Sequence, residues 1–467
     1  MLQVCLAVSF IFILGSGCSS ICADQILSAE QIEPDNNVLR HKLKIETKEN
    51  TDLFVRYWQK DNKDSIFSTA VSKNKTTHHP VLIHLKPAHS YEYELVIEKD
   101  NCQWTSPVAN FTTKEIPLGL MDMAVLAESE EASIPDKFKN GFVLTARRDL
   151  PGYMFIVNVK GEIVWYQQVN ESGFKVAHFT KEGTLLSILA PLSFPTSYGN
   201  EILEMNLEGD TIFTLKKGEK GFDKTIHHEM IKNNSGHYVT ITLEERILDL
   251  REVGGNEQDT VTGDGILVLD KEGNRVWEWT VFDVLDPKSD SNILKDKSDW
   301  LHANSLSIDN DGNYILSFYL SGQVWKIDSK TGKLIWKMGR GGDFIFPKGG
   351  EFFESHTVHR TDKNDLMLFE NGTDKRRSRV LEYTIDETKH TATLNMEMDL
   401  PGNLYTQRMG SVYWIDNTHL LVCSSQERAI VLTDKAGNIL WRLRAGFIPY
   451  RAEFIDKASF FRQPTNN

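Results

Sequence analysis

Short apolar runs that alternate with polar turns recur along the chain in six copies of one unit. Each copy closes with an apolar run, a turn that holds Gly or an Asp-Glu pair, and a second apolar run that usually ends in Trp. The runs have strand length and are rich in β-branched and aromatic residues, so each copy is predicted to form a β-hairpin. The six hairpins begin at Phe155, Ile202, Ile266, Val324, Val380 and Ile430.

A further pair of short strands precedes each hairpin, as in HYVTITLEE from His237 and NYILSFYL from Asn313. Four strands per unit, at a period of about 40–60 residues, are typical of a β-propeller. We therefore predict an all-β fold with a six-bladed propeller over residues 116–467. Equivalent positions in different blades gather around the axis of a propeller, so side chains far apart in the sequence can meet in one pocket.

The region before the propeller, residues 24–115, has its own pattern of strands and is predicted to form a small β-sandwich domain. Its segment LKPAHSYEY, from Leu85 to Tyr93, resembles the tyrosine corner of fibronectin type III domains. In such a corner the hydroxyl group of Tyr91 would return to the chain beside Pro87. A different small sandwich fits the pattern nearly as well.

The first residues carry an apolar stretch followed by small residues, which predicts a secretory signal peptide over residues 1–23. A lipoprotein anchor at Cys18 is the alternative, and the residues before it fit that motif poorly. Cleavage after Ala23 would leave Cys102 and Cys423, which allow one disulfide between the domains or two free thiols. We therefore expect a secreted, extracellular protein.

Composition narrows the classes of partner. The 467 residues carry a formal net charge of −13 at pH 7 and no long basic run, so nucleic acid is not an expected partner. After the leader, no apolar segment is long enough to suggest a membrane span. The oligomeric state is left open. Asn-x-Ser/Thr triplets predict a glycoprotein and lie at Asn74, Asn110, Asn170, Asn233 and Asn371.

Three blade units open on histidine, at His227-His228, His302 and His356, ahead of the strand predicted to be innermost. Innermost strands line the channel of a propeller, so these side chains are predicted to share a pocket at its mouth. A single histidine could equally be satisfied by hydrogen bonds within its blade, but three at matched positions favour a functional cluster.

Other uses of such histidines are less favoured. A metal site is disfavoured because neighbouring residues on a strand, here His227 and His228, point to opposite faces and no further ligands lie at suitable spacing. Serine hydrolysis is disfavoured because the chain has no Gly-x-Ser-x-Gly segment. No cofactor is expected.

The segments IHHE, DWLHANS, FFESHTV with LMLFENG, SRVLEYTID and PYRAEF occur in order between Gly141 and Phe454, and together they resemble the arylsulfate sulfotransferases. The most specific stretch is DWLHANS together with KIDSKTGKLIWKMG. The resemblance implies a six-bladed propeller with a small N-terminal β-domain. It also implies transfer of a sulfuryl group from an aryl sulfate to a phenolic acceptor through a sulfated histidine, without the nucleotide donor of cytosolic sulfotransferases.

Carried over onto this sequence, the resemblance makes His356 the residue that becomes sulfated. His302 and His228, or His227 in place of His228, would then exchange the proton and bind the sulfuryl oxygens. Neutral imidazole is a good nucleophile near neutral pH, which agrees with this assignment.

Substrate-binding residues are expected around these histidines, at Asn304, Tyr319, Arg360 and Arg408. Tyr319 stands where the family has an arginine that holds the sulfuryl group, and a tyrosine brings no positive charge. Arg340, Arg360 or Arg408 would then have to supply that charge from neighbouring loops.

This departure keeps a second function open. A propeller without the family arginine could be an extracellular binding module for sulfated or phenolic ligands, or for a protein partner. A structural matrix glycoprotein is a third alternative. Tyr319→Arg would distinguish an enzyme from a binding module, because the arginine should raise turnover only where the rest of the machinery is intact.

Overall fold

The computed structural model describes residues 25–32, 37–99, 102–195 and 197–461. The chain divides into two compact units, one ending at Glu115 and the other running from Ile116 to Arg462. The predicted signal peptide, residues 1–23, lies outside the described residues. None of the helices in the described part of the chain is long and apolar enough to cross a membrane.

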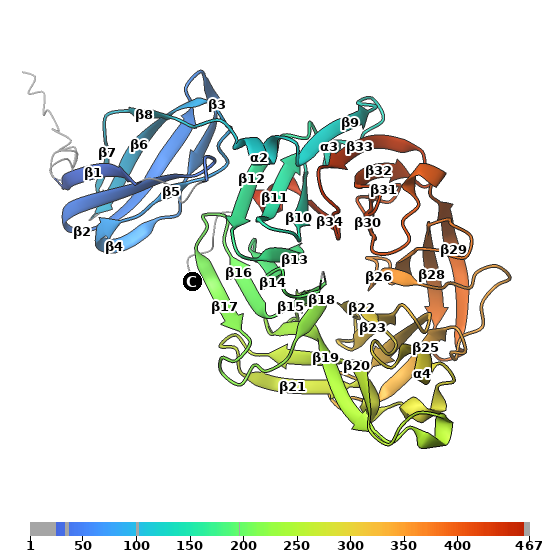
Figure 1. Cartoon of the computed structure of the whole chain (residues 1–467). Helices are drawn as coiled ribbons and strands as arrows, with labels where there is room; N and C mark the ends of the chain where they lie inside the picture. The colour runs from blue at the N-terminus through green and yellow to red at the C-terminus, as the bar shows by residue number, and fades with distance from the viewer. Residues whose placement is uncertain (1–24, 33–36, 100–101, 196, 462–467) are drawn as a thin grey trace, which may run out of the picture. The chain divides into compact units, whose positions relative to one another are not determined.

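The N-terminal unit is one curled sheet of eight strands (Figure 1). Its strands are β1 (Ile26–Ile32), β2 (His41–Gln59), β3 (Asn62–Ser68), β4 (Ser72–His78), β5 (Val81–Leu82), β6 (Ser90–Lys99), β7 (Cys102–Thr105) and β8 (Ala109–Thr112). The long strand β2 pairs with five of the others, so the sheet folds around a core that includes Leu53 and Ile97. Before β6 the backbone N–H of Lys86 donates to the hydroxyl of Tyr91 at 2.7 Å, the contact expected of a tyrosine corner. Kinship with fibronectin type III domains stays a prediction.

The second unit confirms the predicted six-bladed propeller, and its first three blades follow the repeat in the sequence. Blade one consists of β34 (Ala452–Ile455), β10 (Phe142–Arg147), β11 (Gly152–Asn158) and β12 (Ile163–Val169). Blade two consists of β13 (Gly173–Phe179), β14 (Leu185–Ala190), β16 (Glu201–Met205) and β17 (Thr211–Lys216). Blade three consists of β15 (Tyr198–Gly199), β18 (Ile226–Lys232), β19 (Tyr238–Leu248), β20 (Asp259–Leu269) and β21 (Arg275–Thr280).

The other three blades complete the ring (Figure 1). Blade four consists of β22 (Ala303–Ile308), β23 (Tyr314–Phe318), β24 (Gln323–Ile327) and β25 (Leu334–Gly339). Blade five consists of β26 (Ser355–Arg360), β27 (Leu366–Glu370), β28 (Arg379–Asp386) and β29 (Thr391–Asp399). Blade six consists of β30 (Ser411–Trp414), β31 (His419–Ser424), β32 (Ala429–Asp434), β33 (Ile439–Ala445) and β9 (Ala124–Ser129).

The ring closes through strands from both ends of the propeller sequence. The C-terminal strand β34 pairs with β10 as the innermost strand of blade one, and the early strand β9 pairs with β33 at the outer edge of blade six. Two closures make opening of the ring costly, because each would expose unpaired backbone groups. The repeat in the sequence does not predict β9, because its outer position follows no local pattern.

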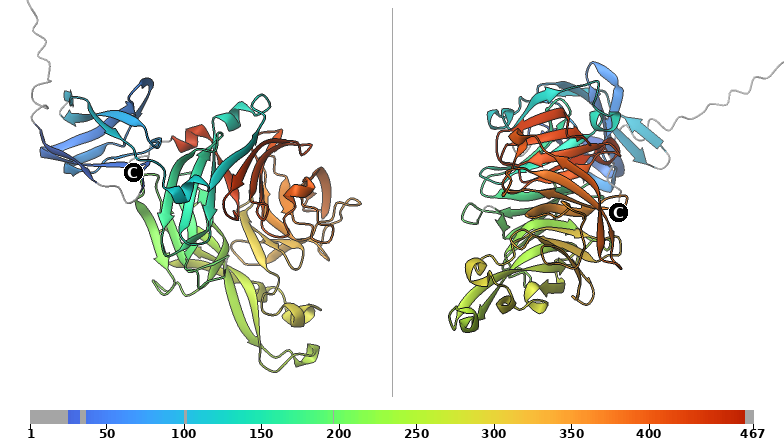
Figure 2. Two further views of the ribbon diagram at one scale, coloured as in Figure 1. Left: turned by 45° about the horizontal axis from the view of Figure 1, so that its top comes forward. Right: turned by 90° about the vertical axis from the view of Figure 1, so that its right-hand side faces the viewer.

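Short helices occupy the connections. They are α2 (Leu118–Met121), α3 (Asp136–Lys139), α4 (Ile293–Asp296), α5 (Lys457–Phe460), η1 (Arg251–Val253), η2 (Val281–Asp283), η3 (Pro287–Ser289) and η4 (Gly402–Leu404). The insertion between β21 and β22 contains η2, η3 and α4, and it extends outward together with the long β19–β20 hairpin (Figure 2).

The tryptophans that end the predicted hairpins hold neighbouring blades together. In three of the blades the indole N–H reaches from the outer strand to a backbone carbonyl in the hairpin turn of the next blade. This contact gives a physical reason for the repeated Trp in the sequence, since a buried indole needs a hydrogen-bond acceptor. The pairs are Trp165 with Leu207 at 2.8 Å, Trp279 with Gly332 at 2.9 Å and Trp441 with Val159 at 2.6 Å.

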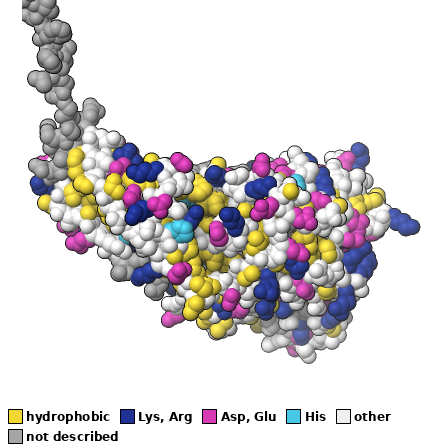
Figure 3. Space-filling view, turned by 90° about the horizontal axis from the view of Figure 1, so that it is seen from above, with side chains coloured by type: hydrophobic (Ala, Val, Ile, Leu, Met, Phe, Trp, Pro, Cys, Tyr) yellow, Lys and Arg dark blue, Asp and Glu magenta, His cyan; other side chains and the backbone are white. Residues whose placement is uncertain are grey.

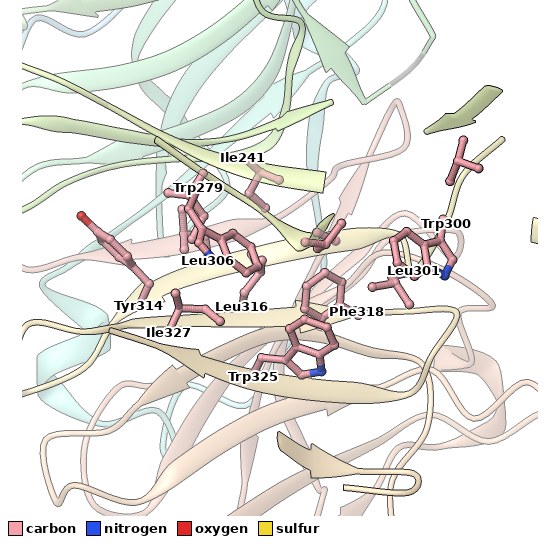
Figure 4. Packing of buried hydrophobic residues seen from close by; sticks show 14 of the residues in the cluster. Ile241, Trp279, Trp300, Leu301, Leu306, Tyr314, Leu316, Phe318, Trp325 and Ile327 are labelled. Atoms are coloured by element: carbon pink, nitrogen blue, oxygen red, sulfur yellow. The ribbon is translucent and has the colours of Figure 1, made fainter. Parts of the chain in front are cut away.

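Apolar side chains fill the space between blades three and four (Figure 4). Trp279 and Ile241 of blade three pack with Leu306, Leu316 and Trp325 of blade four, and all five are at most 3% exposed. Trp300 and Leu301, which directly precede His302, belong to the same cluster. The chain leading into the histidine pocket is therefore held by the core.

The burial of particular side chains bears on the expected disulfide and on the expected glycosylation sites. Cys423 is buried and free, so it forms no disulfide in this structure. Asn371 is completely buried, which is inconsistent with its use as a glycosylation site, whereas Asn74, Asn110 and Asn170 are exposed. Acidic and basic side chains are interspersed over most of the face seen in Figure 3. Secretion and glycosylation stay predictions.

Candidate active site

The structure brings the predicted histidines into one cluster at the start of the innermost strands. Because every blade repeats the same up-and-down order, the innermost strands run in the same direction and begin at the same end of the channel. The ring centres of His228 and His302 lie 5.2 Å apart. Tyr319 links the cluster to its third member, at 5.7 Å from His302 and 5.4 Å from His356. The three blade-opening imidazoles thus lie in one cluster.

The backbone at these positions adopts left-handed conformations that non-glycine residues rarely occupy. The φ angles are +60° at His228, +58° at His302, +51° at Thr357 and +64° at Met409. Irregular pairing accompanies them, since the registers of β18, β22 and β26 all shift near these residues. Such strain at matched places in four successive blades is typical of functional sites, where it aims side chains that regular strands would turn away.

Hydrogen bonds define the tautomer of His356. Asn371 donates its side-chain N–H groups to the carbonyls of Thr406 and Met409, both at 2.8 Å, so its Oδ1 must be an acceptor. His356 Nδ1 lies 2.6 Å from that oxygen and therefore carries the proton. The other ring nitrogen, Nε2, keeps its lone pair and accepts the backbone N–H of Met409 at 3.3 Å. Asn371 thus leaves Nε2 available as a nucleophile.

Burial keeps His356 neutral. The residue is 3% exposed, and burial lowers its pKa to about 3, with the charges of His302 and Arg451 acting in the same direction. Its lone pair is therefore available throughout the physiological pH range.

The pKa of His302 is shifted in the opposite direction from that of His356. Its Nδ1 lies 2.7 Å from Oδ2 of Asp299, three residues earlier in the same loop. Burial disfavours the charged imidazole, but the Asp299 carboxylate outweighs burial and raises the pKa of His302 above its ordinary value. His356 is thus held neutral, whereas Asp299 favours the protonated form of His302, and acid–base chemistry needs two groups that differ in this way.

His227 and His228 contact each other, so the expectation that they point to opposite faces is wrong. Their Nδ1 atoms are 2.7 Å apart, because the left-handed backbone at His228 and the irregular register after His227 break the alternation of the strand. His228 joins the cluster, where burial lowers its pKa well below the ordinary value. His227 lies behind it, with Nε2 3.4 Å from Oδ1 of Asp264.

Arg451 brings a positive charge close to the histidines, whereas the sequence suggests Arg340, Arg360 or Arg408 for this role. Arg451 directly precedes β34, the innermost strand of blade one, is 6% exposed, and donates to the backbone carbonyl of Asn304 at 3.1 Å. Its charge is among those that lower the pKa values of His228 and His356. Glu229 pairs with the other end of the guanidinium group, and the pKa of Glu229 falls to about 2 despite its burial.

A chain of alternating charges continues from this pair. His178 Nε2 lies 2.5 Å from Glu229, and its Nδ1 contacts Glu453. Burial alone would lower the pKa of His178, but the two carboxylates outweigh it and raise the pKa to about 10. The chain Arg451–Glu229–His178–Glu453 therefore holds the guanidinium group rigidly beside the pocket.

The four predicted substrate-binding residues take different places. Tyr319 lies between His302 and His356, but its hydroxyl donates to the carbonyl of Gln407 at 2.9 Å. Its ring therefore packs between the two imidazoles, and its hydroxyl group is already hydrogen-bonded to the chain. Arg408 is exposed in the loop before β30, on the same side of the channel.

The other two residues serve the fold. The fully buried side chain of Asn304 joins strands, donating to the Ser355 carbonyl at 2.8 Å and accepting from Ser317 at 2.9 Å. Arg360 forms ion pairs with Asp309 at 3.0 Å and Glu387 at 2.5 Å, and no described contact links it to the histidines.

No group of three or more His, Cys, Asp or Glu residues in the described part of the chain is arranged to hold a metal ion. A pocket of about 220 Å³ lies beside the pocket of the histidines, on the insertion, and its lining includes Trp300, Leu301 and Arg340. Arg340 stacks on Phe353 with 4.7 Å from its guanidinium carbon to the ring centre.

Comparison with known families gives one match. The family model described as Arylsulfotransferase (ASST) matches residues 128–445, which span nearly all of the propeller blades. No curated protein matches the chain.

Solved structures with distant similarity share low identity with the chain. A protein of unknown function from Bacteroides caccae has 11% identity over 68% of this chain and 99% of its own, with a TM-score of 0.44. A streptogramin B lyase has 12% identity over 72% of this chain and 95% of its own, with a TM-score of 0.37. A catalytically inactive virginiamycin B lyase from Staphylococcus aureus has 8% identity over 69% of this chain and 98% of its own, with a TM-score of 0.34. These similarities are too distant to bear on function.

Proposed function

Since the chain belongs to the arylsulfotransferase family, we propose that it transfers the sulfuryl group of an aryl sulfate to a phenol through a sulfated His356. The observation that carries the proposal is the fixed tautomer of His356, whose Nε2 keeps a lone pair because Asn371 binds Nδ1–H. A neutral, oriented imidazole is what a nucleophile for this reaction requires.

In the first half of the reaction Nε2 of His356 attacks the sulfur atom and the bond from sulfur to the aryl oxygen breaks. The electron pair of that bond leaves with the phenolate oxygen. Protonated His302 gives its proton to this oxygen, which yields a neutral phenol, a neutral His302 and a sulfated His356. The proton on Nδ1 of His356 stays in place and remains hydrogen-bonded to Asn371.

The second half reverses these steps with a different phenol. Neutral His302 accepts the proton of the acceptor, and the resulting oxygen attacks the sulfur atom. The bond between sulfur and Nε2 breaks and returns the lone pair to His356. One histidine thus acts as acid and then as base, which the pairing with Asp299 supports by keeping Nδ1 occupied.

Three groups around Nε2 would bind the oxygens of the transferred group. The Met409 N–H points at Nε2 and is released when that atom bonds to sulfur. His228 adjoins His302, and Arg451 contributes a positive charge that the arginine missing at position 319 would otherwise supply. Donors already in place for developing charge are a main source of catalysis in such reactions.

A burst experiment tests the proposal. The protein is mixed with 4-nitrophenyl sulfate, without nucleotide, and 4-nitrophenol is followed over time. We expect a burst equal in amount to the protein, followed by slow release that accelerates when phenol is added. Release that shows no burst and ignores the phenol would contradict a sulfated intermediate, and no release at all would contradict the activity.

The pH profile tests the roles of Asn371 and Asp299 separately. In the native protein kcat/KM should fall on the acid side as His356 is protonated near pH 3, and on the alkaline side as His302 loses its proton above its ordinary pKa. Asn371→Asp places a carboxylate on Nδ1–H, which favours the protonated ring, and should raise the acid limb by about 1–3 pH units. Asp299→Asn removes the carboxylate from His302 and should lower the alkaline limb.

Each variant serves as the control for the other, because each should leave the opposite limb in place. A general loss of structure would reduce activity at every pH and move neither limb. The roles given to Asn371 and Asp299 would be contradicted if one variant moved both limbs of the pH profile. They would also be contradicted if the two variants moved neither limb.

A further inference from the structure

The start of the channel has two chemically different halves. In the order of the ring, blades three, four and five carry the histidines. The neighbouring blades six, one and two carry cations near the same end, namely Arg408 before β30, Arg148 after β10 and Lys175 in β13. The clustered histidines thus come from blades three to five, and these three basic side chains come from blades six, one and two.

Arg148 lies at the histidine end of the channel. It follows β10, whose residue Thr145 pairs with Ala452 at the start of β34. Its guanidinium carbon is 5.5 Å from the ring centre of Tyr450, and that same ring lies 5.8 Å from the ring of His228. Tyr450 thus contacts the histidine cluster and the cation together.

The two inner cations have no acidic partner. Arg148 is 7% exposed, and its Nε is buried without a hydrogen-bond partner among the described residues. Lys175 is 3% exposed, and its Nζ donates only to the Arg148 carbonyl, at 3.4 Å. Neither forms an ion pair in the described part of the chain. The charge of the Asp149 carboxylate raises the pKa values of both cations, but Asp149 is exposed and forms no ion pair with either in the described part of the chain.

Two buried cations side by side destabilise a protein unless an anion joins them. Burial lowers the pKa values of Arg148 and Lys175, and Arg148 lowers that of Lys175 further. A bound anion would remove this cost. The arrangement therefore has the character of an anion site.

The anion in question is distinct from the sulfuryl group. Arg451 is already paired with Glu229, and its charge lowers the pKa values of His228 and His356, whereas Arg148 and Lys175 have no carboxylate partner in the described part of the chain. The sulfuryl group at His356 would thus be served by Arg451. The unpaired cations lie beyond Tyr450.

We propose that Arg148 and Lys175, with Arg408 at the rim, bind a second anionic group, a carboxylate or a further sulfate, on the aromatic donor or acceptor. The preferred substrates are then acidic phenols and their sulfates. The ring of Tyr319 contacts the nucleophile His356, and the ring of Tyr450 contacts Arg148. This inference rests on the proposed function for the identity of the ligand.

Two phenols of equal shape test it, 4-hydroxybenzoate and its neutral amide 4-hydroxybenzamide. Their binding is measured by calorimetry, without any sulfate donor, so that no turnover occurs. We expect the native protein to bind the carboxylate on the order of tenfold more tightly than the amide, because only the carboxylate forms ion pairs with the two cations. Arg148→Gln and Lys175→Met should each reduce this preference, and the amide should bind as before.

Arg147→Gln is the matched control, since it removes the same charge from the adjacent residue, whose guanidinium donates to the Leu150 carbonyl. It should keep the preference. Equal binding of the two phenols by the native protein, or an unchanged preference in Arg148→Gln, would overturn the inference. Sulfuryl transfer to the amide is measured in parallel, so a protein that prefers the carboxylate but transfers to neither phenol would contradict only the proposed function.

Discussion

Replacing His356 with alanine should reduce sulfuryl transfer by a factor on the order of 10⁴ or more, because it removes the neutral nitrogen whose lone pair is fixed by the contact with Asn371. His302 is held as an acid by Asp299, and Nδ1 of His228 is engaged by His227. The measurement is transfer from 4-nitrophenyl sulfate to phenol. Mass spectrometry of the native protein after incubation with the donor alone should locate the sulfuryl group on His356, and the variant should carry none.

His359→Gln is the control for this experiment. His359 is an imidazole on the same strand, three residues further along, and its ring packs against Tyr413 at 5.1 Å. Its loss should leave a sulfated His356 detectable. Transfer that persists in His356→Ala would place the nucleophile elsewhere. A native protein that binds aryl sulfates without transferring them would favour the binding module over the enzyme.

Much of the fold could be read from the sequence because the repeat is local. Each hairpin has its own turn, which local sequence encodes. The Trp that closes a hairpin forms a hydrogen bond with the next blade in three of the six blades, at Trp165, Trp279 and Trp441. Ring closure could not be read in this way. It joins β34 and β9 to strands far away in the sequence, and such pairing depends on the completed ring rather than on any local pattern.

The same distinction between local and long-range patterns applies to the residues of the site. The three histidines could be predicted because they recur at matched positions of the repeat. Asn371, Asp299 and Arg451 lie within the quoted segments LMLFENG, DWLHANS and PYRAEF, yet each has an ordinary role elsewhere in proteins. Asn371 was read as a glycosylation site, since Asn-Gly-Thr carries no sign that its amide is buried against two carbonyls.

Two features of the pocket had no signal in the sequence. The contact between His227 and His228 depends on a left-handed backbone at a non-glycine residue, which residue type does not indicate. The unpaired state of Arg148 and Lys175 depends on the absence of a carboxylate from their described surroundings, and only the folded chain shows which side chains surround them. Candidate residues could thus be found from the sequence, but their charge states could not.

His302→Gln should reduce transfer by an amount that depends on the leaving phenol. A weakly acidic phenol leaves as a poor phenolate and needs the proton of His302, so release from phenyl sulfate should fall by about 10²–10⁴-fold. A strongly acidic phenol needs little help, so release from 4-nitrophenyl sulfate in a single turnover should fall far less. The measurement is the rate of the burst for the two donors.

The pH dependence separates this role from a loss of structure. In the native protein the burst from phenyl sulfate should slow as pH rises through the raised pKa of His302, because the acid is consumed. The variant has no such acid and should lack this alkaline decline. An equal loss for both donors, with the decline intact, would show that His302 only shapes the pocket, and the proton would then have to come from His228 or from water.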